Sequence, residues 1–334
     1  MESLRTGGHM TGYLLSRLWQ GVLLVAVMSL VVFVGLFAIG NPVDMFVNPD
    51  ADQAEIARTT AALGLDKPIG AQYLGFVRKA LAGDLGNSFV YGSSASSLIL
   101  ARLPATLELA MLAMVIAIGL GIPLGLWAGL KPDSWAGRII MGGSVVGFSL
   151  PTFWVGLILI MVFAVQLQWL PSSGRGDTGM LFGFSLSVLT ADGWRHLLLP
   201  ALNLALFKLS LIIRLTRSGT REALTQDYVR FARAKGLSGS RIVGVHVLKN
   251  VLVPIVTVIG MEFGSLLAFS VVTESIFAWP GMGKLLIDSI TQLDRPVVVA
   301  YLMLVAVLYV VISLLTDIAY SLLDPRVRLG GASS

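Results

Sequence analysis

The chain has 334 residues, of which 55% are hydrophobic and only 13% are charged, and its formal net charge is +5. A soluble domain of this size has about a quarter of its residues charged, so the composition excludes an ordinary soluble protein and indicates an integral membrane protein. The positive excess is expected on the cytoplasmic side of such a protein, and it does not by itself indicate a nucleic-acid partner. Because there is no cysteine, disulfides and thiolate chemistry are also excluded.

Six apolar segments follow a short polar N-terminal tail, and each is long enough to cross a bilayer core, which takes about 20 residues of helix. The tail covers residues 1–12, and its first nine residues, which precede a second methionine, are assigned no role. The apolar segments are residues 13–39, 106–130, 139–165, 196–215, 251–272 and 297–322. The first is too long for a signal peptide and no cleavage site follows it. The sequence therefore predicts an all-α integral membrane protein with six transmembrane helices.

The basic residues set the predicted orientation. An even number of helices puts both termini on one side, and placing them in the cytoplasm leaves most lysines and arginines inside. Residues 324–334 then form a cytoplasmic tail, and residues 40–102 form an extracytoplasmic segment between the first two helices. Apolar residues recur within residues 72–81 of that segment, so a short amphipathic helix is expected on the outer face.

Small residues repeat inside the second predicted helix. Gly121, Gly125 and Gly129 stand four residues apart, a spacing that lets helices approach closely in lipid. Prolines at positions 123 and 151 predict local kinks, which neighbouring helices can accommodate. These features indicate a tightly packed helix bundle.

Two ionisable residues lie near the middle of predicted helices, Lys208 in the fourth and Glu262 in the fifth. A charge at this depth is costly and usually faces a partner or a water-filled path. Because the two lie at matched depth, they could form an ion pair. Two interpretations stay open, a structural ion pair and a lining of the translocation path.

No pattern in the chain predicts catalysis or metal binding. The segment nearest to a phosphate-binding loop, residues 281–284, lacks the upstream glycine, and Leu285 follows its lysine. The three histidines are far apart in sequence, and there is no H-E-x-x-H motif. We therefore expect no catalytic residue, no metal site and no cofactor on this chain, and no energy source of its own.

The segment between the fourth and fifth helices carries a recognisable motif. It reads TRSGTREALTQDYVRFARAKGLS over residues 216–238 and resembles the corresponding stretch of ABC-importer permeases in the dipeptide/oligopeptide/nickel, binding-protein-dependent family. It contains that family's form of the E-A-A-x-x-x-G motif, which begins at Arg230 and ends at Gly236. In the family this segment is a short cytoplasmic coupling helix that docks on the ATPase. The resemblance places an ATPase-coupling loop within residues 216–250, at Asp227, Tyr228, Arg230, Phe231, Ala232, Arg233, Ala234, Lys235, Gly236, Leu237 and Ser238.

Motifs at family spacing extend the resemblance over nearly the whole chain. They cover residues 63–73, 83–88, 103–109, 273–283 and 323–326. The resemblance implies the type I ABC-importer permease fold, with the permease domain over residues 103–323. It also implies an outer gate or docking site, formed by Asp66, Lys67, Asp84, Glu274, Trp279, Pro280 and Gly281.

The physical chemistry of the motif agrees with a coupling helix. Gly236 can end a helix in the left-handed conformation, and basic residues such as Arg233 and Lys235 suit a helix C-terminus. Ala232 and Ala234 are expected to keep the docking face slim. A purely topological role would explain the positive charge, but it leaves the alanine and glycine pattern unexplained.

The resemblance implies half of a translocation pathway in the bacterial inner membrane. The implied partners are a second homologous permease, two ATP-binding subunits or domains that hold ATP and Mg, an extracytoplasmic solute-binding protein and membrane lipid, with no nucleic acid. Family members carry short peptides, nickel chelates, haem precursors or oligosaccharides, and we expect di- or oligopeptides here.

Two other classes of function remain as alternatives. One is a secondary transporter that uses Lys208 and Glu262, neither of which is expected at these points in the family, as an ion relay. The other is a membrane scaffold without a transport role. The coupling-loop motif disfavours both.

Overall fold

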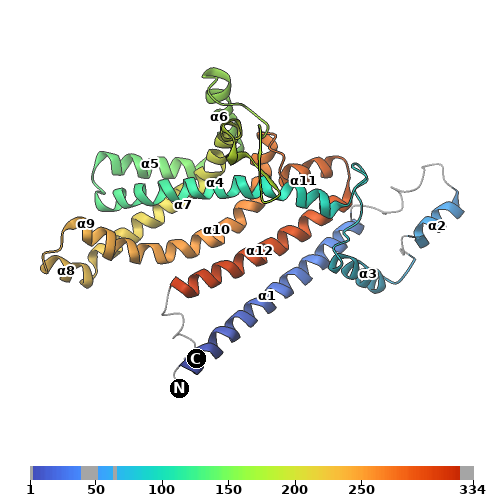
Figure 1. Ribbon diagram of the computed structural model, residues 1–334, viewed down its shortest axis with the longest axis horizontal. Coiled ribbons are helices and arrows are strands. Elements are labelled where there is room, and N and C mark those ends of the chain that lie inside the picture. Colours follow the sequence, from blue (N-terminus) through green and yellow to red (C-terminus); the bar gives the residue numbers. More distant parts are fainter. Residues whose placement is uncertain (1–2, 39–51, 63–65, 324–334) are drawn as a thin grey trace. The chain divides into compact units, whose positions relative to one another are not determined.

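The computed structural model describes residues 3–38, 52–62 and 66–323 (Figure 1). The predicted C-terminal tail, residues 324–334, lies outside these ranges, as do residue 39 of the first predicted helix and residues 40–51 and 63–65 of the predicted outer segment. The chain divides into two compact units, each treated by itself below. Unit 1 comprises Met1–Gly12, Arg102–Leu285 and Val311–Ser334, and unit 2 comprises Tyr13–Ala101 and Leu286–Val310.

The described part of the chain is mainly helical. Its helices are α1 (Ser3–Ala38), α2 (Gln53–Ala62), α3 (Ile69–Leu81), α4 (Ala95–Leu130), α5 (Trp135–Ser149), α6 (Thr152–Leu159), α7 (Ala191–Thr225), α8 (Asp227–Ala234), α9 (Gly239–Arg241), α10 (Leu248–Ile276), α11 (Met282–Thr291) and α12 (Arg295–Leu323). Two π-helical segments, η2 (Ile160–Gln166) and η4 (Ile242–Val247), and one 3₁₀ turn, η3 (Ser187–Leu189), join them. Among the described residues, five helices are long and apolar enough to cross a membrane, or six if one bent pair counts as a single span.

The bent pair lies where the third membrane helix is predicted. α5 and the run formed by α6 and η2 meet at an angle of 110° (Figure 1). Leu150, between them, has φ −81° and ψ 137°, because a residue that precedes proline is disfavoured from the helical region. Pro151 therefore breaks the predicted helix, a stronger effect than a local kink. The exact number of spans and the orientation stay predictions.

The predicted glycine repeat lies where α4 packs on α7. Gly121 faces Ile212, Gly125 faces Thr216 and Gly129 faces Thr220. A Cβ atom on Gly125 would lie 2.5 Å from Thr216 Cβ and 2.7 Å from the Ile213 carbonyl oxygen. The two helices therefore approach too closely for any larger residue at this position.

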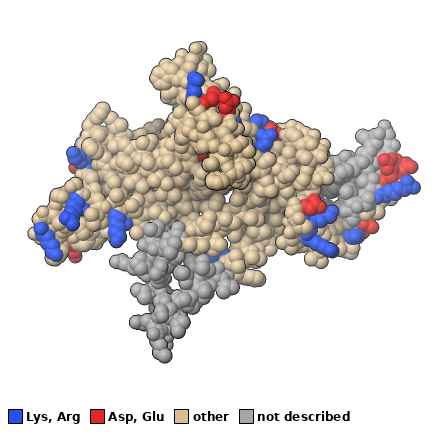
Figure 2. Space-filling view, in the orientation of Figure 1, with Lys and Arg blue, Asp and Glu red and all other residues tan. Residues whose placement is uncertain are grey.

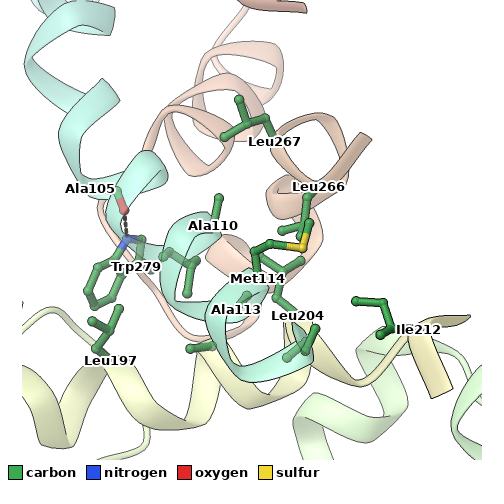
Figure 3. Close-up of a cluster of buried hydrophobic side chains, with 14 residues drawn as sticks. Ala105, Ala110, Ala113, Met114, Leu197, Leu204, Ile212, Leu266, Leu267 and Trp279 are labelled. Carbon is green, nitrogen blue, oxygen red and sulfur yellow. Dashed lines mark hydrogen bonds between the residues drawn. The ribbon is translucent and has the colours of Figure 1, made fainter. Parts of the chain in front are cut away.

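The main apolar core of unit 1 lies between α4, α7 and α10 (Figure 3). The α4 side supplies mostly alanines, which let the larger side chains Leu204, Leu266 and Leu267 pack closely against it. Trp279 is fully buried at one end of this core, and its indole Nε1 donates a hydrogen bond to the Ala105 carbonyl oxygen at 2.9 Å. The core therefore connects the membrane helices to the loop that follows α10.

In unit 2, the amphipathic helix predicted for residues 72–81 is present as α3. It packs on α1 through Phe33, whose ring centroid lies 5.3 Å from that of Tyr73 and 5.9 Å from that of Phe76. The hydroxyl groups of Ser29 and Tyr73 are also hydrogen-bonded at 2.8 Å. This contact gives a polar residue of the apolar helix a partner within the protein.

A small β-hairpin departs from the all-α expectation. Strands β1 (Gly179–Leu181) and β2 (Phe184–Leu186) pair antiparallel. The two residues between them, Phe182 and Gly183, both have positive φ, 51° and 83°. Two positive φ values are the mark of a type I′ turn, which the glycine favours. The hairpin shows that the segment between the third and fourth predicted helices is structured.

The α4–α7 contact predicts opposite outcomes for two glycines on the same helix. Gly125→Leu should destabilise the protein by about 1–3 kcal/mol, because the new side chain overlaps Thr216 and the α7 backbone. Gly119→Leu is the matched control, since nothing lies within 4 Å of its Cβ position. Thermal unfolding midpoints of the two variants in the same detergent check this prediction, and equal midpoints would contradict it.

Candidate functional site

The predicted coupling loop folds as a short helix between α7 and α10. α8 begins after Gln226, which is in the extended region at φ −72° and ψ 150°. Val229 and Ala232 are buried against Ile242, Val247 and Val251, which belong to η4 and α10. The eight-residue helix is therefore attached to unit 1 through one apolar side.

Gly236 ends this helix in a Schellman motif. Its φ is +75°, its N–H donates to the Arg233 carbonyl at 2.9 Å, and the Leu237 N–H donates to the Ala232 carbonyl at 3.2 Å. Leu237 also packs against the buried cluster that holds Ala232. These are the two hydrogen bonds and the hydrophobic contact of that C-terminal cap. The left-handed turn at Gly236 is therefore present.

The opposite side of α8 is exposed. The exposed residues of α8 and its C-cap are Asp227, Tyr228, Arg230, Phe231, Arg233, Ala234 and Lys235, and Asp227 Oδ1 lies 3.4 Å from Arg230 Nη1. Lys235 Nζ lies 4.6 Å from the centroid of the Phe231 ring, which is 62% exposed. Basic side chains gather over the end of unit 1 that carries α8 and α9 (Figure 2). A large, solvent-exposed aromatic ring beside positive charges is a surface suited to binding another protein.

Ala232 departs from its expected position. It is 4% exposed and faces the bundle, so it does not belong to the exposed side of α8. A small residue is needed there because α8 packs against η4 and α10. Ala234 is exposed, as a residue of a docking face should be. The inward position of Ala232 follows from the helical spacing of Val229 and Ala232, three residues apart.

Tyr228 contributes a neutral hydrogen-bonding group to this surface. Burial, and secondly the negative charge of Glu222, raises the pKa of Tyr228 above its usual value. The hydroxyl group therefore stays protonated at neutral pH and can both donate and accept. The net positive charge of the exposed surface comes from Arg230, Arg233 and Lys235, which outnumber Asp227.

A second set of predicted residues surrounds the Glu274 carboxylate, near the C-terminal end of α10. Glu274 is fully buried, and Oε1 accepts hydrogen bonds from Thr106 Oγ1 at 2.8 Å and Ser270 Oγ at 3.1 Å. Oε2 accepts from the backbone N–H of Gly283 at 2.7 Å and of Lys284 at 3.0 Å, in the first turn of α11. Four donors therefore tie α4, α10 and α11 to one carboxylate.

The predicted outer-gate residues next to Glu274 are enclosed by the protein. Gly281 leaves room for the carboxylate, because a Cβ on Gly281 would overlap Glu274. The Pro280 carbonyl accepts a hydrogen bond from Arg102 Nη1 at 3.4 Å, and Trp279 is fully buried. The structure thus brings Glu274, Trp279, Pro280 and Gly281 together, but Glu274, Trp279 and Gly281 present no side chain for docking.

The other three residues predicted for the outer face belong to unit 2. Asp66, Lys67 and Asp84 are exposed. Asp84 Oδ1 accepts a hydrogen bond from the Gly86 N–H at 3.0 Å, within the turn formed by residues 83–88. This turn is anchored by the fully buried Asp294, which accepts hydrogen bonds from Ser88 Oγ and, at 3.2 Å, from the Phe89 N–H. The sequence gives no local signal for this long-range contact.

Lys208 of α7 and Glu262 of α10 form an ion pair between Nζ and Oε2. Ser265 Oγ accepts a hydrogen bond from Lys208 Nζ at 2.7 Å and lies 3.1 Å from Glu262 Oε2. The side chain of Lys208 is 9% exposed and that of Glu262 is 29% exposed. The two residues that the sequence places at matched depth are therefore in contact.

A further buried ion pair is absent from the sequence predictions. Arg175, which precedes the hairpin, donates to Glu108 Oε2 in α4 at 2.8 Å and to the Ser185 carbonyl at 2.6 Å. Glu108 Oε1 accepts from the Val188 N–H at 2.8 Å. An acid inside the second predicted span was a signal that a partner must exist. The pair holds the hairpin on α4.

Metal chemistry has no candidate site in the described residues. No group of three or more His, Asp or Glu side chains lies close enough to bind one ion there. The geometry consists of a membrane bundle, an attached short helix with an exposed aromatic and basic face, and buried charges that are paired or hydrogen-bonded. This arrangement suits a membrane component that responds to other proteins.

Two family models match the chain. Residues 121–329 match the binding-protein-dependent transport system inner membrane component, and residues 10–110 match the N-terminal model of the membrane component of these systems. The chain belongs to this permease family. The resemblance stated from the sequence is thus confirmed.

The relatives of this permease carry consistent names. It is 44% identical to the di/tripeptide transport system permease protein DppB of Pseudomonas aeruginosa, over 86% of this chain and 90% of the relative. It is 41% identical to the dipeptide transport system permease protein DppB of Escherichia coli K12, over 81% of this chain and 85% of the relative. The glutathione transport system permease protein GsiC of Salmonella choleraesuis is 35% identical, over 96% of this chain and 99% of the relative.

A solved structure confirms the fold class. The inward-facing MetNI methionine ABC transporter aligns with a TM-score of 0.54 at 16% identity, over 68% of this chain and 96% of that chain. The permease is therefore a multi-pass protein of the bacterial inner membrane and a subunit of an ABC importer. It is no ATPase, and its family implies ATP-binding subunits and a substrate-binding protein.

The Glu274 network predicts a graded loss of stability. Glu274→Gln should cost about 1–3 kcal/mol, because one carboxylate oxygen becomes an NH2 group and one of the two pairs of buried donors loses its acceptor. Ser270→Ala removes one of the four hydrogen bonds and should cost less. Glu222→Gln, at an exposed acid, is the control. Thermal unfolding midpoints in one detergent rank the stabilities of the three variants. A Glu274 variant as stable as the control would show that the carboxylate does not stabilise the fold.

Proposed function

We propose that this permease forms half of the translocation pathway of a peptide importer and that α8 couples this pathway to ATP hydrolysis. The main support for the proposal is the exposed face of α8, which presents Phe231 beside basic side chains. The helix itself ends in a well-defined C-terminal cap at Gly236. Relatives named for dipeptide, di/tripeptide and glutathione transport support a peptide substrate. Both termini and the loop are placed in the cytoplasm on the charge distribution.

The connectivity of α8 explains how coupling would work. α8 follows α7 directly and is packed on η4 and α10, so a displacement of α8 acts on two membrane helices at once. Coupling between distant sites needs an element with two states that both sites bias. We assign the exposed residues between Asp227 and Ser238, a segment that contains the motif, as the contact surface for the ATP-binding subunits. ATP and Mg would bind to the ATP-binding subunits and not to this chain.

A permease that forms half of a translocation pathway needs partner proteins. A second homologous permease completes the pathway, and a solute-binding protein delivers substrate at the outer face. Asp66, Lys67 and Asp84 are exposed and are assigned to docking, while Glu274, Trp279, Pro280 and Gly281 are assigned to the outer gate. Lipid surrounds the apolar helices, and we assign no nucleic acid. A secondary transporter that uses Lys208 and Glu262 is not favoured, because the relatives are ABC permeases.

Coupling is tested at Gly236. Gly236→Trp should abolish peptide uptake and substrate-stimulated ATP hydrolysis in the assembled importer, because φ +75° disfavours any side chain and the indole would obstruct the docking face. Gly183→Trp is the matched control, since Gly183 also has positive φ, is also exposed and also has open space at its Cβ position. Uptake and ATPase rates are measured in proteoliposomes. Unchanged uptake in Gly236→Trp would mean that α8 is not the coupling element.

Docking at the outer face is tested by charge reversal. The double variant Asp66→Lys with Lys67→Glu should raise the concentration of binding protein needed for half-maximal ATPase stimulation, while the ATPase rate without binding protein stays the same. The effect should shrink at high salt, because exposed charges are screened. An unaltered dependence on binding-protein concentration would remove these residues from the docking surface.

A further inference from the structure

The Glu262 carboxylate has two oxygens in different surroundings. Oε2 accepts from Lys208 Nζ and lies within hydrogen-bond distance of Ser265 Oγ. Oε1 has no hydrogen-bond partner among the residues that the structure describes. The side chain is 29% exposed, so part of it lies at an open edge of α10.

The open edge is unsuited to lipid. A carboxylate oxygen that faces hydrocarbon is costly, even where a lysine balances its charge from the other side. Among its neighbours on α10, Met261 is 65% exposed and Phe269 is 70% exposed. Small-molecule sites combine apolar walls with a few polar groups, and this side of α10 supplies both kinds of group. This side of α10 therefore suits a water-filled path.

The role of Lys208 restricts what Glu262 can bind. Lys208 is 9% exposed, is held by Glu262 and Ser265, and lies with Nζ 5.2 Å from the centroid of the Phe207 ring. It is therefore not available to a substrate, and it reduces the negative charge of Glu262 without covering Oε1. The exposed edge of the pair accepts hydrogen bonds and attracts cations.

We propose that Glu262 Oε1 binds the terminal ammonium group of a peptide during its passage, with Lys208 as the positioning residue that keeps this contact weak. The inference rests on the proposed peptide-import function and adds a residue that distinguishes free from blocked amino groups. Weak binding suits transit, because a substrate must leave each site that it enters. An ammonium group has three donors, so it can bind Oε1 and still keep water or backbone contacts.

Single-cysteine labelling tests this proposal, since the chain has no cysteine of its own. Met261→Cys, next to Glu262, is placed in the assembled importer in nanodiscs and treated with a cationic or an anionic methanethiosulfonate reagent. The cationic reagent should react faster, and Glu262→Gln should reduce this preference by roughly fivefold, because one charge about 8 Å away in water acts on the two reagents in opposite directions. Val115→Cys, at a 64% exposed apolar position of α4, is the control for a lipid-facing thiol and should react slowly with both reagents.

Protection by peptide identifies the recognised group. Millimolar dialanine, added directly without binding protein, should slow the labelling of Met261→Cys, whereas N-acetyl-dialanine should protect much less. Glu262→Asp should retain part of the protection, and Glu262→Gln should lose it. Failure of Met261→Cys to react, or equal protection by the two peptides, would overturn the proposal.

These outcomes are separate from those of the coupling test. Labelling needs no ATP hydrolysis, so Gly236→Trp should label as the parent does while its uptake is lost. If uptake depends on Gly236 but labelling shows no preference between reagents, the importer assignment stands and the Glu262 contact is wrong. The first labelling experiment needs no change at Glu262, so it remains decisive even if a Glu262 variant assembles poorly.

Discussion

A polar group inside a membrane protein needs a partner within the protein or in a water-filled cavity, because the hydrocarbon core offers no hydrogen bonds. The most buried charges here obey this constraint. Glu108 pairs with Arg175, Lys208 pairs with Glu262, and the Glu274 carboxylate accepts four hydrogen bonds. The contacts of Arg175 with Glu108, of Lys208 with Glu262 and of Thr106 with Glu274 join residues that are 67, 54 and 168 positions apart, so these polar groups also fix which helices are neighbours.

Close packing supplies the second part of the architecture. Apolar side chains gain little by leaving lipid for one another, so helix association depends on shape and on close approach. The glycines of α4 leave space for side chains and backbone atoms of α7 to approach closely. The alanines of α4 leave space for the larger side chains of α10. Polar contacts therefore determine which helices pack together. Small residues determine how closely the axes of those helices approach.

Local features of the sequence predicted much of this arrangement. The apolar segments, the helix at residues 72–81 and the turn at Gly236 depend on nearby residues and are present. The size of the 110° break at Pro151 was underestimated, because a proline predicts only where a helix breaks. The direction of the following segment depends on the packing of Gly156 against Asn203 and Phe277, which are far away in sequence. The contacts of Arg175 with Glu108 and of Ser88 with Asp294 were missed for the same reason, since they span 67 and 206 residues.

The length of α7 has a consequence for assembly. Its 35 residues make a helix about 52 Å long at a rise of 1.5 Å per residue, whereas the hydrocarbon core is about 30 Å thick. The helix therefore extends well past the lipid tails, and arginines at positions 214, 217 and 221 favour the end next to α8 as the one that projects. This excess works as a stalk. In the proposed topology, this extension carries α8 beyond the hydrocarbon core, toward the ATP-binding subunits that it is proposed to contact.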